Sequence, residues 1–189
     1  YYHKENTGCV KFRPQVKNND FFINSKKMRE HVLHSLDHSY LSMPSIYNSA
    51  VNKNIVDKIR SSDGVFFNAQ TPDVYSGLRI SYEVERYPFL IYPITISGVS
   101  SYSNGIATFR ASSSNIGNEF VELNQQADNG LDKTLPNIQC YSTCIADSYF
   151  KIIQRANVKK NSLKLDYNKL YNKTIDHIID NHVGTFVDK

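Results

Sequence analysis

Apolar side chains recur at helical spacing in the first third of the chain. The spacing predicts one helix over residues 24–40 and a second over residues 45–59, with Pro44 ending the first. Asn24 or Ser25 can cap the first helix, because a short polar side chain accepts a hydrogen bond from the free N–H groups of the first turn. Each predicted helix has one apolar face, formed by Met28, Val32, Leu36 and Tyr40 in the first and by Ile46, Val51, Ile55, Val56 and Ile59 in the second.

The middle of the chain changes to an alternating pattern, which is typical of strands. Over residues 78–85 every second side chain is apolar, so one face of this segment is expected to be buried and the other wet. Asn104-Gly105 favours a tight hairpin turn between two further apolar segments. We therefore predict an antiparallel meander of three to four strands, over residues 65–67, 78–85, 89–99 and 106–111.

Helical spacing returns in the last third of the chain, over residues 138–156 and 166–182, whereas the polar residues 112–118 are predicted to be a loop. This order predicts an α+β fold, in which the antiparallel three- to four-strand meander is flanked by N-terminal and C-terminal helix pairs. A chain of 189 residues suffices for one core and is short for two. We predict an extended N-terminal arm over residues 1–20 and a single α+β domain over residues 21–189.

Composition narrows the classes of partner. Hydrophobic residues make up 40% of the chain and charged residues 21%, which is enough apolar side chain for a folded core. The net charge of +4 comes from Lys and Arg residues that are scattered rather than clustered, so nucleic acid is not the expected partner. No apolar run reaches the roughly 18 residues of a membrane-spanning helix. Because the chain opens with Tyr1 rather than Met, we expect a fragment from which a leader or an N-terminal anchor could be missing.

The three cysteines do not form a disulfide framework, because their number is odd. The simplest interpretation is three free, buried thiols in a reducing compartment. The alternative is a bridge from Cys9 to Cys140 or Cys144. A bridge between Cys140 and Cys144 is geometrically awkward, because residues four apart share one helix face. A bridge from Cys9 would fit an extracytoplasmic or secreted location.

Three histidines of the first predicted helix are the candidate metal ligands. At about 100° per residue, His31, His34 and His38 project within an arc of roughly 60°, on the side away from the apolar face. Imidazoles three or four residues apart can chelate zinc, and three adjacent imidazoles would also become charged together between about pH 7 and 5. The simplest interpretation is a solvated polar face, and a metal-binding or pH-sensing domain is one alternative function.

Cys144 and His177 are the candidate catalytic residues. Cys144 lies early in a predicted helix, where the helix N-terminus lowers the pKa of a thiol, and a nearby histidine would make it a nucleophile. His177, with Asp176 and Asp180 beside it, could supply that base, as could the histidines of the first helix. A second alternative function is therefore a cysteine-dependent hydrolase or transferase, although nothing in the sequence places a histidine beside Cys144. A buried structural thiol and a charged helix surface are the simpler interpretations.

The common catalytic signatures are absent from the sequence, including the Gly-rich nucleotide loops, the nucleophile elbow and the His-Glu-x-x-His motif. Its 13 Tyr and 10 Phe residues instead suit a surface that contacts another protein. We therefore expect a non-enzymatic protein-binding or assembly domain without a cofactor. A composition rich in Asn, Lys and Tyr and free of Trp is typical of an AT-rich genome. The expected setting is a larger bacterial or viral protein of a host-interaction or secretion-type assembly.

Overall fold

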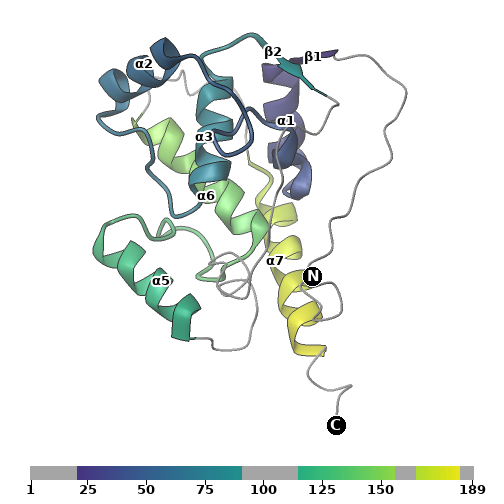
Figure 1. Cartoon of the computed structure of the whole chain (residues 1–189). Helices are drawn as coiled ribbons and strands as arrows, with labels where there is room; N and C mark the ends of the chain where they lie inside the picture. The colour runs from purple at the N-terminus through teal and green to yellow at the C-terminus, as the bar shows by residue number, and fades with distance from the viewer. Residues whose placement is uncertain (1–20, 91–114, 156–164, 184–189) are drawn as a thin grey trace, which may run out of the picture.

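The computed structural model describes residues 21–90, 115–155 and 165–183, and most of these residues lie in helices. Figure 1 shows α3 and α6 crossing near the middle, with α1 and α2 beside them and α5 and α7 at the opposite end of the molecule. The elements are β1 (Phe21–Asn24), α1 (Ser25–Ser35), the 3-10 helix η2 (His38–Ser42), α2 (Lys53–Asp63), α3 (Pro72–Ser81), β2 (Arg86–Phe89), α5 (Asn115–Gln126), α6 (Tyr141–Arg155) and α7 (Tyr167–Val183).

The predicted α+β fold with a three- to four-strand meander is wrong. Within the described residues the only sheet is a two-stranded antiparallel ribbon, in which β1 pairs with β2. Residues 65–67 form no strand. The predicted turn at Asn104-Gly105, the strand over residues 106–111, most of the strand over residues 89–99 and the N-terminal arm lie outside the described residues.

The segment 78–85, predicted as a strand, instead contains the end of helix α3 and the turn that leads to β2. Its alternation was misleading because α3 is covered on every side, with residues 74–81 all buried. A helix without a solvent-facing side has no polar face, so its sequence does not show the 3.6-residue period. Pro72 at the first helical turn is the start signal that the sequence does contain.

The helices at the two ends agree better with the predicted pattern. Helices α6 and α7 occupy the two predicted C-terminal segments, and the side chain of Asn24 caps α1 by accepting a 3.0 Å hydrogen bond from the N–H of Lys27. Helix α1 ends earlier than predicted, because Leu36 adopts a left-handed φ of 53° while its side chain is buried in the core. Helix α2 begins later than predicted, at Lys53.

Helix α5 was missed, because its N-terminal residues were predicted as part of the polar loop 112–118. Its sequence is rich in Asn and contains Gly117, residues that favour loops over helices. None of the described helices combines the length and the apolar character that crossing a membrane requires.

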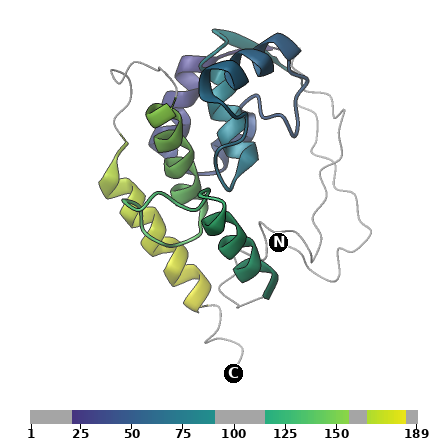
Figure 2. The same cartoon turned by 90° about the vertical axis from the view of Figure 1, so that its left-hand side faces the viewer.

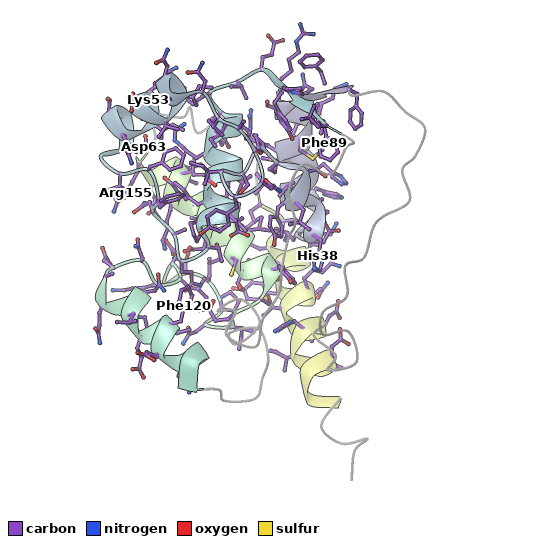
Figure 3. All side chains as sticks on the ribbon, in the orientation of Figure 1. His38, Lys53, Asp63, Phe89, Phe120 and Arg155 are labelled. Carbon is purple, nitrogen blue, oxygen red and sulfur yellow. The ribbon has the colours of Figure 1, made fainter. Side chains whose placement is uncertain are left out.

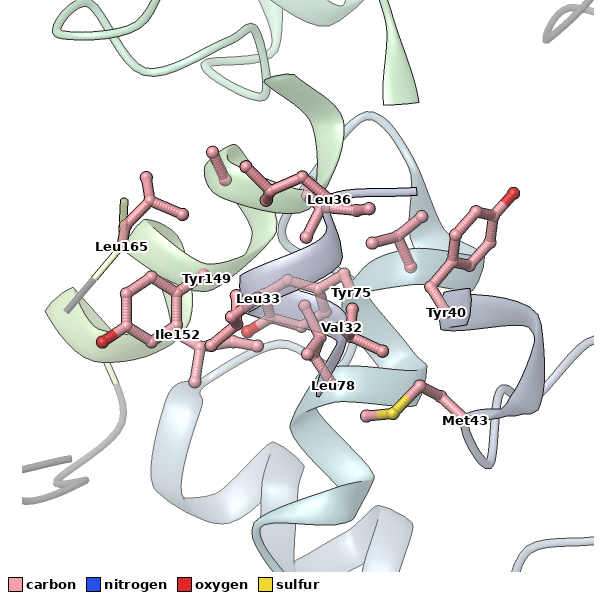
Figure 4. Close-up of a cluster of buried hydrophobic side chains, with 14 of the residues drawn as sticks. Val32, Leu33, Leu36, Tyr40, Met43, Tyr75, Leu78, Tyr149, Ile152 and Leu165 are labelled. Carbon is pink, nitrogen blue, oxygen red and sulfur yellow. The ribbon is translucent and has the colours of Figure 1, made fainter. Parts of the chain in front are cut away.

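The main core lies where α3 and α6 meet α1. Tyr75 and Leu78 of α3 and Ile152 of α6 are buried together with Val32 and Leu33 of α1, as Figure 4 shows. Helix α7 closes the same core from the other side of α6 with Leu170, and Figure 2 shows the two helices side by side along part of their length. A smaller cluster of Ile59, Phe66 and Ile80 lies between α2 and α3.

Gly77 allows the loop after η2 to cross directly over α3. A Cβ atom at this position would lie 2.9 Å from the Cβ of Met43, which is closer than two such atoms approach in proteins. The hydroxyl of Ser76, the preceding residue, is 3.3 Å from the N–H of Ile46 and accepts a hydrogen bond from it. The missing side chain of Gly77 and the small one of Ser76 therefore fix how close the loop lies to the helix.

Arg79 brings a positive charge into the buried helix α3. Its guanidinium binds Asp63 through two hydrogen bonds, from Nε at 2.6 Å and from Nη2 at 3.0 Å, and Nη1 donates to Glu83 at 2.5 Å. The side chain of Asp63 is fully buried and that of Arg79 is 3% exposed. Burial favours a raised pKa for Asp63, but the hydrogen bonds from Arg79 and Ser62 and the charge of Arg79 outweigh it and lower this pKa.

A second buried ion pair attaches the α5–α6 connection to α6. The Nζ atom of Lys151 lies 3.1 Å from Oδ2 of Asp147 and donates to the carbonyls of Asn129 and Gly130. The other carboxylate oxygen of Asp147 accepts a 2.8 Å hydrogen bond from the N–H of Asp132. Asp147 and Lys151 thus provide hydrogen-bond partners for backbone N–H and C=O groups of the α5–α6 connection. Most of this connection has no regular secondary structure that could provide them.

We predict that Gly77→Ala destabilises the protein. Alanine is the better helix former by about 1 kcal/mol, but its Cβ would press on Met43, and forced overpacking of this kind costs about 1–3 kcal/mol. The free energy of unfolding should be measured by urea denaturation. Asn172→Ala, on the exposed surface of α7, is the matched control, because it raises helix propensity without a new contact. A Gly77→Ala protein as stable as the control would contradict the close approach.

The Asp63–Arg79 pair should make stability depend on pH. Because the folded-state pKa of Asp63 is lowered, its contribution is fully present above the unfolded pKa of about 3.9 and is lost as the pH falls through the folded value. Asp63→Asn should therefore cost about 3–5 kcal/mol at neutral pH, and the difference from the unmodified protein should shrink in strong acid.

Urea denaturation at several pH values measures this difference. Asp57→Asn, which removes one partner of the exposed pair with Lys53, should cost less than about 1 kcal/mol at every pH. A difference for Asp63→Asn that stays constant into strong acid would refute the assigned direction of the pKa shift.

Candidate functional site

The three histidines predicted as metal ligands do not share one helix. His31 and His34 are exposed on α1, whereas His38 follows the left-handed residue Leu36 and begins η2 (Figure 3). The ring of His38 instead lies against that of Tyr141, with the ring centres 4.2 Å apart. Among the described residues no group of three or more His, Cys, Asp or Glu side chains is arranged to hold a metal ion. Zinc binding and pH sensing thus remain predictions without structural support.

Cys144 lies in the core rather than at a surface. It is 1% exposed on α6, and no disulfide joins Cys144 or the neighbouring Cys140 to another described residue. Its Sγ atom lies 4.0 Å from the side-chain oxygen of Gln139. Burial raises the pKa of the Cys144 thiol well above its usual value, and the nearby Cys140 and Asp147 act in the same direction. Nucleophilic cysteines need the opposite environment, with partial exposure and nearby positive charge.

His177 is half-buried on α7, and burial lowers the pKa of its imidazole against the opposing charge of Asp180. This keeps the ring neutral at physiological pH, which a general base requires but which a structural histidine also shows. Cys9 lies outside the described residues, as does the side chain of His182, so the predicted disulfide remains a prediction.

Comparison with protein-family models, with curated protein sequences and with solved structures found no match.

A row of exposed apolar side chains on α7 is the feature that the search for catalytic residues missed. Tyr167, Tyr171, Ile175 and Ile179 recur every four residues and are 48%, 47%, 51% and 52% exposed. We call these four side chains the α7 row. Four residues are slightly more than one helical turn, so the row winds by about 120° around the helix over a length of about 18 Å.

At about 100° per residue, the α7 row begins beside the buried side of the helix, at Tyr167, and ends on the opposite side, at Ile179. Leu170 and Thr174 are 0% and 3% exposed and face the core, where the Thr174 hydroxyl lies near Cys140 and Ser142 of α6. Figure 2 shows why the burial is incomplete, because α7 continues well beyond the end of α6. The apolar arc of α7 is thus wider than the surface that the other described elements cover.

The sequence did contain the signal for this row. The helical spacing over residues 166–182 places five side chains on one apolar face, namely Tyr167, Tyr171, Ile175, Ile178 and Ile179. Such a face is normally buried. What the sequence lacks is the position of α6, which covers only one part of that face.

We predict that Cys144 does not react as a catalytic thiol. In a Cys9→Ser protein, alkylation by iodoacetamide at neutral pH, mapped by mass spectrometry, should be at least roughly a hundredfold slower at Cys144 in the folded state than in urea, because the reagent must wait for the core to open. The urea-unfolded sample is the control for intrinsic reactivity. Rapid alkylation of the folded protein would restore the nucleophile hypothesis.

Proposed function

We propose that this chain is a non-enzymatic protein-binding or assembly domain, and that the α7 row is its contact surface. The observation that carries the proposal is the half-exposure of four large apolar side chains in line on one helix. Soluble proteins rarely leave apolar side chains contiguous on the surface without a use for them, and tyrosines are enriched where proteins meet. The unreactive environment of Cys144 supports a binding role over a cysteine-dependent enzyme.

The partner that fits the α7 row is an amphipathic helix of another protein. Side chains four residues apart form the ridge that packs into the groove of a second helix, and the length of the row matches about three helical turns. Such a helix would lay its own apolar residues along the row and leave its polar side in water.

The area of the α7 row argues against a second copy of this chain as the partner. Four half-exposed side chains amount to a patch of a few hundred Å². A stable dimer of two globular chains buries about 800 Å² on each partner. The row is therefore too small to hold two copies together and is of a size that suits one added helix.

The wider setting is proposed from composition alone. A host-interaction or secretion-type assembly of a bacterium or virus would use a helix-binding module of this kind, and the AT-rich character of the sequence supports such a source.

A photo-crosslinking experiment tests the contact surface. A benzophenone amino acid in place of Tyr171 should crosslink to a helical segment of one protein in extracts of the producing cells. The same probe in place of Tyr47, an exposed tyrosine between η2 and α2, is the matched control and should not capture that protein.

Binding is then measured with the purified partner by fluorescence anisotropy. We expect Ile175→Ser/Ile179→Ser to weaken binding by at least about tenfold, because each lost anchor removes about 1 kcal/mol or more, while Leu123→Ser on α5 leaves binding unchanged. Crosslinks to a second copy of the chain, or equal affinities for all variants, would overturn the proposal.

A further inference from the structure

A cleft opens at the end of the molecule away from α7, between the first turns of α1 and the turn over residues 82–85. Its volume is about 590 Å³ and its lining is mostly polar and charged. Figure 1 places this region beside the β1–β2 ribbon. The cleft is independent of the α7 row, because the two share no residues.

Arg29 is the unusual residue of this cleft, because its guanidinium is half-buried without a carboxylate partner among the described residues. One nitrogen, Nη1, donates to the backbone carbonyl and the hydroxyl of Ser81. The Cζ atom lies 4.1 Å from the centre of the Tyr82 ring, on which the cation rests. The Nε atom is buried and has no hydrogen-bond partner.

A half-buried cation without a carboxylate partner has an energetic cost. Burial lowers the pKa of Arg29, and the opposing contributions of Tyr82 and Glu30 do not restore it. Charged side chains removed from water are normally paired, because the remaining solvent cannot offset the lost hydration. An anion that reached the cleft would supply the missing partner.

The acidic side chains around the cleft are largely engaged elsewhere. Glu83 is 12% exposed and binds both Arg79 at 2.5 Å and Lys58 at 2.7 Å. Glu30 faces Lys26, with the charged atoms 4.0 Å apart. These two carboxylates therefore add little net negative charge to the cleft.

Three charged side chains of the lining have no ion-pair partner among the pairs described above, namely Lys27, Arg29 and Glu85. They determine the net charge of the cleft. Two positive charges and one negative charge leave a single net positive charge, which matches one monoanion. A doubly charged phosphate would instead leave the cleft with one net negative charge. The guanidinium is held by Ser81 through Nη1, and its planar group of N–H donors has the geometry that carboxylates bind.

We propose that this cleft is a binding site for a carboxylate group, with Arg29 as its main ligand and Lys27 beside it. The carboxylate belongs either to a small organic acid or to a peptide, as a free C-terminus or an acidic side chain. The ligand would sit between α1 and the turn over residues 82–85 and would fix these two segments relative to each other.

The test is a titration followed by two-dimensional ¹H–¹⁵N NMR, including the side-chain Nε–H signal of arginine. Sodium acetate and acetyl-trialanine with a free carboxyl group are the two carboxylate probes. Acetyl-trialanine amide, inorganic phosphate and sodium chloride at equal ionic strength are the controls. We expect saturable shifts in residues 25–30 and 81–85 with both carboxylates, and tighter binding of the peptide would identify a peptide as the source.

The variants connect these shifts to Arg29. Arg29→Met keeps the aliphatic stem and removes the charge, so carboxylate binding should weaken at least about tenfold. Arg60→Met, on the exposed side of α2 and outside the cleft, should bind like the unmodified protein. If Arg29→Met fails to fold, Lys27→Met at the exposed rim provides the second variant, with an expected loss of about threefold.

Several outcomes would overturn the assignment. These are shifts that stay linear with concentration, shifts that chloride reproduces, an affinity for carboxylates that is unchanged in Arg29→Met or in Lys27→Met, and tighter binding of phosphate than of acetate. None of these outcomes bears on the α7 row, which the crosslinking experiment tests separately.

Discussion

The packing of α3 against α6 is the contact on which the rest of this structure depends. Residues 74–81 of α3 and residues 142–149 of α6 are buried without a break, so neither helix has a side that faces water. Helices α1 and α2 cover α3, and α7 covers α6. Two helices covered in this way must provide partners for their own polar side chains inside the protein, because water cannot do so.

The two buried ion pairs follow from that requirement, and they also fix the chain around the two helices. Arg79 of α3 binds Asp63 at the end of α2 and Glu83 in the turn after α3. One guanidinium thus connects α2, α3 and this turn. Asp147 and Lys151 do the same for the connection between α5 and α6, whose backbone groups they bind. Removing one partner leaves a buried charge, which costs far more than the loss of an exposed pair.

The sequence predicted those parts of the fold in which one helix face meets solvent. Helix α6 could be located from its apolar period, whereas α3 lacks a polar face and its residues alternated by chance. The candidate sites were chosen by residue type; the described residues contain no group of three or more His, Cys, Asp or Glu side chains that could hold a metal ion, and Cys144 is buried in the core. Arg29 gave no signal, because its neighbours Ser81 and Tyr82 lie 52 and 53 residues further along the chain, and only the folded structure shows that no described carboxylate forms an ion pair with it.

The ribbon of β1 and β2 has two unequal edges. The N–H of Ser25 donates to the carbonyl of Glu85, and because hydrogen-bonded and non-bonded pairs alternate, Phe22 and Pro88 form a non-bonded pair. The nitrogen of Pro88 therefore points away from β1, where it offers no N–H, while the outer edge of β1 keeps the donor of Phe22. A strand added from outside could therefore form all backbone hydrogen bonds only along β1. Because strands cannot add equally well to both edges, the described ribbon is protected against extension into an aggregate.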